Sequence, residues 1–384
     1  IRMKKSLYVF NPENDLALAD GSWNYTAPKY AKKIRNDLQM LPVWYAEAGS
    51  AVLADKSKAN CDFLNDIKRK FCNISGVTVF DACCSIDKIY PWGWSPATCY
   101  QMKQLVYDAS VPSSDIIEVF RSTSHRRTTL RILQGLEYKG VMPKECHNLG
   151  DVSEFLNVFG RCIVKAPWSS SGKGVFLVSK TNFDAYKPLI GGFIKKQGSV
   201  ICEKFLDKVL DFAMEFKSEK GVLSFVGLSV FENNNRFSYE RAVVGSYEVL
   251  LQKIVKYVSS ECIDNLKTKL LEVLSDIIPK EYQGYFGLDM MIFKENGDFV
   301  IMPCIELNLR TTMGLVASMV GENVLEENKE GRMTILFHKS ETELNNFLSH
   351  LKPPVVKCGR LCDGSLLLVP VYSDSRFTAL VEIV

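Results

Sequence analysis

The chain has 384 residues, a length that predicts about two or three domains, with 47% apolar and 24% charged residues. This composition is typical of a soluble globular protein and excludes a disordered or fibrous chain. Lysine and arginine number 47 against 44 acidic residues, so the net charge of +3 argues against a general nucleic-acid binder. No apolar run reaches the roughly 18 residues that are needed to cross a bilayer. The apolar run near the start is also shorter than the about 7–15 apolar residues of a secretion signal. We therefore expect a cytoplasmic protein without nucleic acid or membrane as a partner.

The first third of the chain alternates short apolar runs with amphipathic segments. Short apolar runs predict strands, and apolar residues that recur every three or four positions predict helices. The expected strands are 7–10, 43–45 and 77–80, and the expected helices are 30–40, 61–71 and 97–109. Because strand–helix–strand alternation is typical of parallel pairing, we predict a Rossmann-like α/β domain over residues 1–120.

Beyond residue 120, hairpins with separate helices replace this alternation. The expected strands are 161–166, 175–179, 199–205, 211–218 and 222–232 and the hairpin 285–308, with helices at 182–196, 247–258 and 262–277. Such a pattern indicates an α+β fold. We divide it into a subdomain at 121–200, a second subdomain at 201–335 and a C-terminal extension at 336–384.

A serine- and glycine-rich loop between two apolar strands is the most informative segment. Lys165 closes the first strand, and the loop residues are Ser169, Ser170, Ser171, Gly172, Lys173 and Gly174. Small residues let backbone N–H groups approach an anion closely, and the two lysines supply positive charge. The segment lacks the residue order of a Walker loop, and no helix follows it. It is either a phosphate-binding loop or a plain hairpin loop with a surface lysine.

Three side chains with oxygen ligands lie on the predicted hairpin around the Asn296-Gly297 turn. If the strands pair symmetrically about this turn, Asp289, Glu306 and Asn308 share one face and the two carboxylates are diagonal neighbours. Carboxylates among apolar residues repel each other and lose hydration unless something compensates. Oxygens of Asp, Glu and Asn suit Mg²⁺ carried by a nucleotide phosphate. The alternatives are a protonated carboxylate or an ion pair with Arg310.

A third segment joins two predicted strands through an apolar connector. The first strand ends near Glu203, the connector contains Phe205 and Leu206, and Asp211 opens the second strand. Such a connector can present backbone groups to a base and a carboxylate to a ribose. Taken alone, it is more typical of a surface turn.

Together and in this order, the three segments resemble the ATP-grasp superfamily of ligases. The resemblance covers about residues 120–320, and the N-terminal unit is similar to the domain that precedes the grasp in these enzymes. It implies an ATP-grasp fold of two subdomains, with ATP and Mg²⁺ as cofactors and Mn²⁺ as a substitute. It also implies that Asp289, Glu306 and Asn308 hold the metal.

The same resemblance implies how the nucleotide is bound. Lys165 would contact the α- and β-phosphates, and the loop of residues 169–174 would close over them. Glu203, with Phe205 and Leu206, would contact the adenine, and Asp211 would bind the ribose.

Three arginines receive roles from the resemblance. Arg241, at the end of Ser238-Tyr239-Glu240-Arg241, would reach the γ-phosphate, and Arg310 would stabilise an acyl phosphate. The family usually has a further phosphate-binding lysine upstream, where this chain has Arg126. Arginine and lysine differ in their geometry toward phosphate, so this is a departure from the family pattern.

The reaction implied is ligation of a small-molecule carboxylate to an amine, or to a thiol. ATP would phosphorylate the carboxylate, the amine would attack the acyl phosphate, and ADP and phosphate would leave. This chemistry depends on positioning and charge stabilisation rather than on a covalent nucleophile. It suits a chain with four histidines and no obvious catalytic triad. The alternatives are a small-molecule kinase on the same scaffold and a non-catalytic nucleotide-binding module.

The substrates themselves have no recognisable motif. Open α/β sheets bind ligands at the ends of their strands. The polar and aromatic residues expected in such N-terminal loops are Asn11, Asn14, Asp15, Trp92 and Trp94. Each is explained equally well as a substrate contact or as a turn or packing residue.

Overall fold

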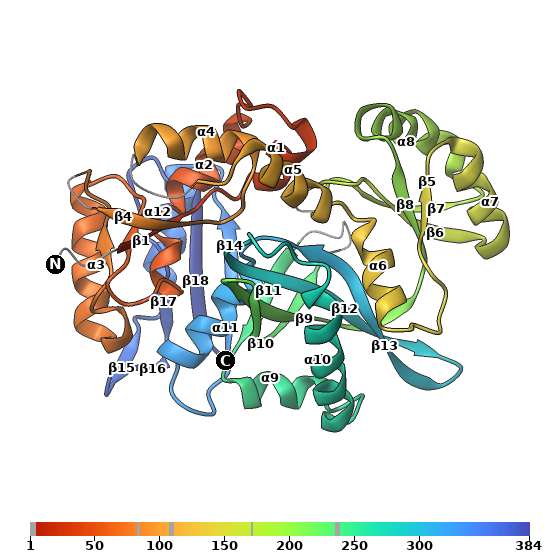
Figure 1. Ribbon diagram of the computed structural model, residues 1–384. Coiled ribbons are helices and arrows are strands. Elements are labelled where there is room, and N and C mark those ends of the chain that lie inside the picture. Colours follow the sequence, from red (N-terminus) through yellow and green to blue (C-terminus); the bar gives the residue numbers. More distant parts are fainter. Residues whose placement is uncertain (1–4, 83–84, 107–110, 170–171, 235–238) are drawn as a thin grey trace.

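The computed structural model describes residues 5–82, 85–106, 111–169, 172–234 and 239–384. Its N-terminal part contains a sheet in the order β3-β2-β1-β4, at the left of Figure 1. The elements of this part are β1 (Lys5–Val9), α1 (Asn14–Asp20), α2 (Lys29–Asp37), η1 (Leu41–Trp44), β2 (Ala51–Val52), α3 (Lys58–Lys70), η2 (Cys72–Ile74), β3 (Thr78–Val79), β4 (Ile86–Pro91) and α4 (Pro96–Leu105). All three strand pairs are parallel, which confirms the pairing predicted from the sequence.

One predicted strand of this part is wrong. Residues 43–45 belong to the 3-10 helix η1 and the residue after it, and the sheet instead uses β2. Pro42, the second residue of η1, lacks the N–H that a central strand needs. Leu41, Val43 and Trp44 are all buried. A short apolar run that is buried on every side does not reveal its secondary structure by periodicity.

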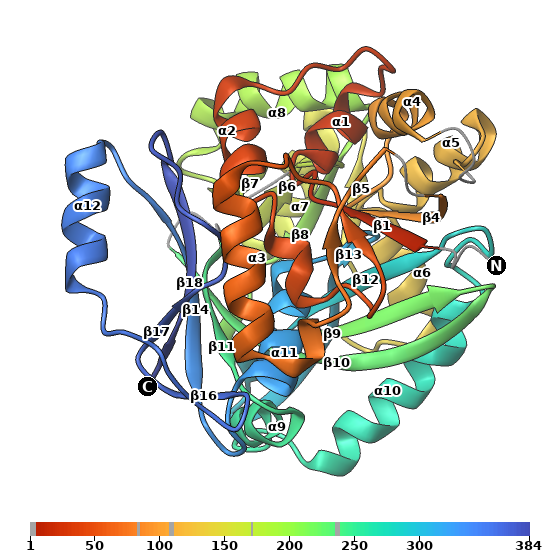
Figure 2. The same cartoon turned by 90° about the vertical axis from the view of Figure 1, so that its left-hand side faces the viewer.

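Serine caps set where two helices of this part begin. The Ser57 hydroxyl accepts a hydrogen bond from the Asn60 N–H at the start of α3, and the Ser95 hydroxyl accepts one from the Thr98 N–H at the start of α4. Figure 2 views the molecule from the side of α3. Within the described ranges, no helix combines the length and apolar character that crossing a bilayer requires.

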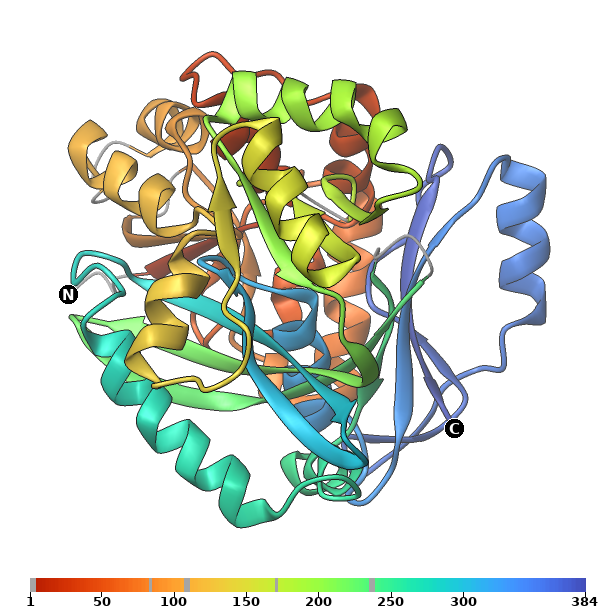
Figure 3. The same ribbon diagram turned by 90° about the vertical axis from the view of Figure 1, so that its right-hand side faces the viewer.

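Helices α5 (Ser114–Thr123) and α6 (Thr128–Gly135) lead from this part to a small antiparallel sheet in the order β5-β8-β6-β7. Its elements are β5 (Lys144–Cys146), α7 (Leu149–Phe159), β6 (Arg161–Lys165), β7 (Val175–Ser179), α8 (Phe183–Gln197) and β8 (Val200–Lys204). Helices α7 and α8 pack on one face of this sheet around Val164 (Figure 3). Ile163 and Lys165 alternate with Val164 along β6 and therefore point to the opposite face.

The rest of the chain builds a large sheet in the order β13-β12-β9-β10-β11-β14-β18-β17. The elements here are β9 (Asp207–Glu219), β10 (Val222–Asn233), β11 (Tyr239–Val244), α9 (Tyr247–Ile254), α10 (Ser260–Ser275), β12 (Gly284–Glu295), β13 (Asp298–Asn308), α11 (Met313–Val324), β14 (Gly331–Phe337), α12 (Glu341–His350), β15 (Val355–Lys357), β16 (Arg360–Asp363), β17 (Ser365–Leu367) and β18 (Phe377–Ile383). Helices α9 and α10 cover one face, below the sheet in Figure 1, and α11 packs on the other.

Two strands of the stretch predicted as a C-terminal extension, β17 and β18, belong to this sheet, whereas β15 and β16 pair with each other in a sheet of their own. The boundary expected at residue 335 falls inside β14, and β18 pairs with β14 along its whole length. In Figure 2 the strands β14 and β18 run beside the N-terminal helices, and α2 contacts β18. The first and last parts of the chain therefore meet along one side of the large sheet.

Candidate functional site

A cavity of about 680 Å³ lies between the small sheet, the large sheet and the N-terminal helices α1 and α2. It is lined by most of the residues singled out from the sequence, namely Arg126, Lys165, Ser169, Gly172, Lys173, Glu203, Phe205, Leu206, Asp211, Asp289, Glu306, Asn308 and Arg310. Of the residues to which the resemblance gives a role, Gly174 and Arg241 are described by the structure but do not line the cavity. Ser170 and Ser171 lie outside the described residues.

The carboxylate hairpin has a different register from the predicted one. Asp289 lies directly opposite Glu306, so the expected diagonal arrangement is wrong. Pairing is symmetric about the turn as far as Met291 and then shifts. Pro303 lies in the shifted stretch, where its missing N–H cannot complete the ladder. The two carboxylates and Asn308 nevertheless share one face, because opposed residues of antiparallel strands point the same way.

The two facing carboxylates differ in their charge. Burial raises the pKa of Asp289 to about 7, and the negative charge of Glu306 adds to this rise. Burial also acts to raise the pKa of Glu306, but Arg126 and Lys165 outweigh it and hold this pKa below its usual value. Glu306 is therefore ionised near neutral pH, where Asp289 is only partly ionised.

The donor set fits a hard cation that brings other ligands with it. In the described part of the chain, no group of three or more His, Cys, Asp or Glu side chains is placed to hold a metal ion. Asp289 and Glu306 supply two carboxylates, and Asn308 adds an amide that hydrogen-bonds Asp289. Mg²⁺ is commonly bound by one or two carboxylates together with substrate phosphates and water. The set is therefore suited to Mg²⁺ that is shared with a nucleotide.

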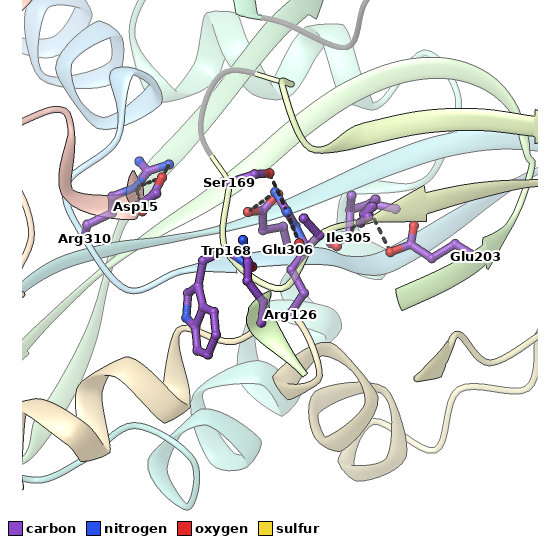
Figure 4. Close-up of polar contacts among 11 residues, drawn as sticks. Asp15, Arg126, Trp168, Ser169, Glu203, Ile305, Glu306 and Arg310 are labelled. Atoms are coloured by element: carbon purple, nitrogen blue, oxygen red, sulfur yellow. Dashed lines mark hydrogen bonds and ion pairs between the residues drawn. The ribbon is translucent and has the colours of Figure 1, made fainter. Parts of the chain in front are cut away.

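Two buried cations hold the carboxylates of the site (Figure 4). Arg126 donates from Nη2 to both oxygens of Glu306, at 2.8 and 3.0 Å, and from Nη1 to the Ser169 hydroxyl at 2.7 Å. The Nζ atom of Lys165 lies 2.7 Å from Glu203 Oε1. The Nε–H of Arg126 has no hydrogen-bond partner among the described residues. Arg126 and Lys165 therefore each pair with a carboxylate that lines the cavity, Arg126 with Glu306 and Lys165 with Glu203.

The connector after Glu203 forms an apolar end of the cavity next to the small sheet. Phe205 and Leu206 line this end together with Ile163, Val175, Met291, Phe293 and Met302. Asp211 accepts hydrogen bonds from Lys208 Nζ at 2.6 Å and Asn233 Nδ2 at 3.0 Å. Burial raises the pKa of Asp211 against the effect of Lys208. An apolar slot with a few polar groups at its edge is typical of small-molecule sites.

The two remaining arginines of the sequence analysis lie in different surroundings. Arg310 lines the cavity and pairs with Asp15, with Nε 3.0 Å from both carboxylate oxygens (Figure 4). Arg241 pairs instead with Glu232 Oε2, 2.8 Å from its Nε, and is not among the residues that line the cavity. The residue of that strand that does line the cavity is Tyr239.

The N-terminal loop residues also separate into two groups. Trp92 lines the cavity, and Asp15 reaches its wall through Arg310. Asn11 is structural, because its Nδ2 donates to the Gly93 carbonyl at 2.8 Å. Trp94 is buried in the apolar core next to the sheet.

Glu215 of β9 is a cavity residue that sequence analysis missed. Its side chain is 1% exposed and accepts hydrogen bonds from the Thr312 hydroxyl, 2.9 Å from each oxygen, and from the Ser229 hydroxyl at 3.1 Å. Burial raises the pKa of Glu215 to about 8. Its signal in the sequence was a spacing of four from Asp211 along one strand, which puts both carboxylates on the same face.

No family model and no curated protein sequence matches the chain. Solved structures do match. A biotin carboxylase β,γ-ATP complex from Campylobacter jejuni has a TM-score of 0.55 at 15% identity, over 100% of this chain and 88% of the other. The biotin carboxylase domain of a Hydrogenobacter thermophilus 2-oxoglutarate carboxylase has a TM-score of 0.53 at 11% identity, over 100% and 87%. An ADP complex of N5-carboxyaminoimidazole synthetase from Staphylococcus aureus has a TM-score of 0.50 at 14% identity, over 100% and 94%. The chain therefore has the ATP-grasp fold that its sequence motifs predict.

Proposed function

We propose that this protein is an ATP-dependent ligase that joins a small-molecule carboxylate to an amine through an acyl phosphate. The observation that carries the proposal is one cavity wall, where Asp289, Glu306 and Asn308 share a face beside Arg126 and Lys165. The similar structures add support, because two are ADP complexes and one is a β,γ-ATP complex.

The cavity suits ATP along its length. The apolar end with Phe205 and Leu206 would take the adenine, and Asp211 would accept hydrogen bonds from the ribose hydroxyls. Lys165 and Lys173 would meet the phosphates. Mg²⁺ bound at the facing carboxylates, with Mn²⁺ as a substitute, would neutralise phosphate charge during transfer.

The reaction would proceed in two transfers. First, a carboxylate oxygen of the substrate attacks the γ-phosphorus, the bond from that phosphorus to the β–γ bridging oxygen breaks, and ADP leaves. Then the amine nitrogen attacks the acyl carbon, inorganic phosphate leaves, and the nitrogen loses a proton. Arg310 would stabilise the charge that develops on the acyl phosphate, and its ion pair with Asp15 would keep it oriented.

The test is a product assay with ATP, MgCl₂, a pool of carboxylic acids and hydroxylamine, which traps an acyl phosphate as a hydroxamate. We expect hydroxamate and ADP in equal amounts from the wild-type protein and neither from Asp289→Asn. Asp298→Asn is the matched control, because Asp298 is an exposed residue of the same hairpin. A stable phosphorylated product that resists hydroxylamine would indicate a kinase. ATP binding without any product would indicate a nucleotide-binding module.

A further inference from the structure

The cavity has a second apolar end, lined by other side chains than those assigned to the adenine. Side chains from strands and N-terminal helices line it, namely Phe10, Leu16, Ile34, Phe231, Ile335 and Phe377. The strand pairings put Phe231, Ile335 and Phe377 on one face of the large sheet. Their strands lie on the β10–β18 side of the sheet, whereas Asp289 and Glu306 lie on β12 and β13 at its other side. The second end begins beside the proposed ribose site, because Phe231 pairs directly with Asp211, and extends from there toward β14 and β18.

Glu215 lines the same cavity, and burial favours the protonated form of its carboxyl group more strongly than the distant charge of Arg310 favours the ionised form. Among the described residues its hydrogen-bond partners are two hydroxyl groups, whereas a carboxylate can accept about four hydrogen bonds. Among the described residues, no Lys, Arg or His forms an ion pair with it. Glu13 at the same cavity is different, because Arg35 Nη1 lies 2.7 Å from its Oε1. A buried carboxylate without a counter-ion costs free energy that a cationic ligand would recover.

Close backbone contacts hold this carboxylate in place. A Cβ atom on Gly287 would lie 2.7 Å from Glu215 Oε2, and one on Gly314 would lie 2.4 Å from Oε1. Both positions therefore require glycine as long as Glu215 stays where it is.

We propose that the second end of the cavity binds the amine substrate, and that this substrate is a primary amine carried on a bulky apolar or aromatic group. The inference rests on the proposed ligase function and adds the class of its amine. The ammonium group would pair with Glu215, and the apolar body would pack against Phe231, Ile335 and Phe377. Before the nitrogen attacks the acyl carbon, Glu215 would take one proton from the ammonium group and so free the nitrogen lone pair. The second proton, which the nitrogen loses once the C–N bond has formed, would leave with inorganic phosphate.

Binding to the full chain, saturated with a non-hydrolysable ATP analogue and Mg²⁺, tests this without turnover. Calorimetric titrations compare 2-phenylethylamine with 2-phenylethanol, which lacks the charge, and with methylamine, which lacks the apolar body. We expect 2-phenylethylamine to bind at least about ten-fold more tightly than either, the size expected for one charge-assisted hydrogen bond. Glu215→Gln should abolish the preference for amine over alcohol, and Phe231→Ala should weaken both ligands. Equal binding of the amine and the alcohol to the wild type, or no binding of either, would overturn the proposal.

Controls separate this proposal from a structural role and from the ligase function. Glu215→Gln keeps an oxygen for the two hydroxyl donors, and Glu240→Gln, at an exposed position, is its matched control. If Glu215→Gln fails to fold, Ile335→Ala and Phe377→Ala carry the test, and unchanged binding of 2-phenylethylamine to both variants overturns the proposal.

The hydroxylamine assay tests the ligase function separately, because hydroxylamine needs no apolar pocket. If hydroxamate forms but 2-phenylethylamine does not bind, the amine class is wrong and the ligase function stands. If the amine binds but no hydroxamate forms, the ligase function fails instead.

Discussion

Arg126 and Glu306 are 180 residues apart and are joined by two hydrogen bonds, at 2.8 and 3.0 Å. Glu306 faces Asp289 across the hairpin, and Arg126 also holds the Ser169 hydroxyl at the start of the proposed phosphate loop. In this arrangement the Arg126 guanidinium compensates the negative charge of Glu306, the carboxylate that we propose as a ligand of Mg²⁺. Binding of Mg²⁺ and ATP would give each of the two residues a new partner, the cation for Glu306 and a phosphate for Arg126.

The first prediction tests this exchange of partners. Arg126→Ala leaves Glu306 with an uncompensated charge, so we expect the free energy of unfolding to fall by about 1–3 kcal/mol. Added MgCl₂ should restore more stability to the variant than to the wild type, because the cation replaces the lost guanidinium. Urea denaturation with and without MgCl₂ measures both effects, with the exposed Arg131→Ala as control. If Arg126→Ala lowers the free energy of unfolding equally with and without MgCl₂, the result would argue against a metal at Glu306.

The second prediction separates the two carboxylates. Asp289→Asn and Glu306→Gln should each lower Mg²⁺-dependent turnover by at least about 100-fold, the upper range for disturbing a metal site. Their stabilities should change in opposite directions at pH 8 without metal. Burial raises the pKa of Asp289 to about 7, so its charge is unfavourable there and Asn should stabilise the fold. Glu306→Gln should destabilise it, because the pKa of Glu306 is lowered by its cationic neighbours despite burial. Thermal unfolding of both variants checks this, and turnover at the wild-type rate in either would remove the metal assignment.

The third prediction concerns pH and Glu215. Burial raises its pKa from 4.5 to about 8, so the folded protein holds this proton more tightly than the unfolded chain. The stabilising contribution is complete below about pH 4.5 and is lost as the pH rises through about 8. Between these values, stability should fall more steeply in the wild type than in Glu215→Gln, by up to about 1.4 kcal/mol per pH unit. A series of urea denaturations across this range gives the two slopes. Equal slopes of stability against pH for the wild type and Glu215→Gln would mean that Glu215 has the same pKa in the folded and unfolded states.

The fourth prediction concerns Lys165. Its ammonium group should meet the α- and β-phosphates as a point charge, so Lys165→Ala should weaken ATP by roughly 10–150-fold while adenosine changes little. Calorimetric titration with both ligands compares the two losses. Lys180→Ala, an exposed lysine just after the next strand, is the control. An equal loss for ATP and adenosine would show that Lys165 only supports the site through Glu203.

The fifth prediction concerns the loop of residues 169–174. Gly172 has a φ of +72°, a conformation that costs a β-branched residue about 1–2 kcal/mol, and Lys173 Nζ lies 3.6 Å from the centre of the Tyr30 ring on α2. We expect ATP with Mg²⁺ to protect the loop from hydrogen exchange, because the phosphates supply partners for its backbone N–H groups. Gly172→Val should slow turnover more than it lowers stability. Exchange that is equal with and without ATP, or normal turnover of the variant, would contradict a closing loop.

Local patterns predicted much of the fold and part of the site. Alternation of side chains along a strand placed Asp289, Glu306 and Asn308 on one face, and this result does not depend on the register. The register itself was mispredicted, because the symmetric pairing about the turn does not continue past Pro303. The strand predicted at residues 43–45 is wrong for another reason: a buried apolar run has no periodicity that distinguishes a strand from a helix.

The sequence by itself determined the local features of the candidate site, because a serine- and glycine-rich loop, a carboxylate hairpin and its turn are each encoded by residues close together in the chain. Only the tertiary structure decided which distant residues complete the site. The Arg126–Glu306 and Arg310–Asp15 ion pairs join different parts of the chain. Arg241 pairs with Glu232 and does not line the cavity. The strand β18, near the end of the chain, pairs within the large sheet, and its Phe377 helps to line the second end of the cavity. These contacts follow from how helices and sheets pack, and packing depends on surfaces that no local pattern describes.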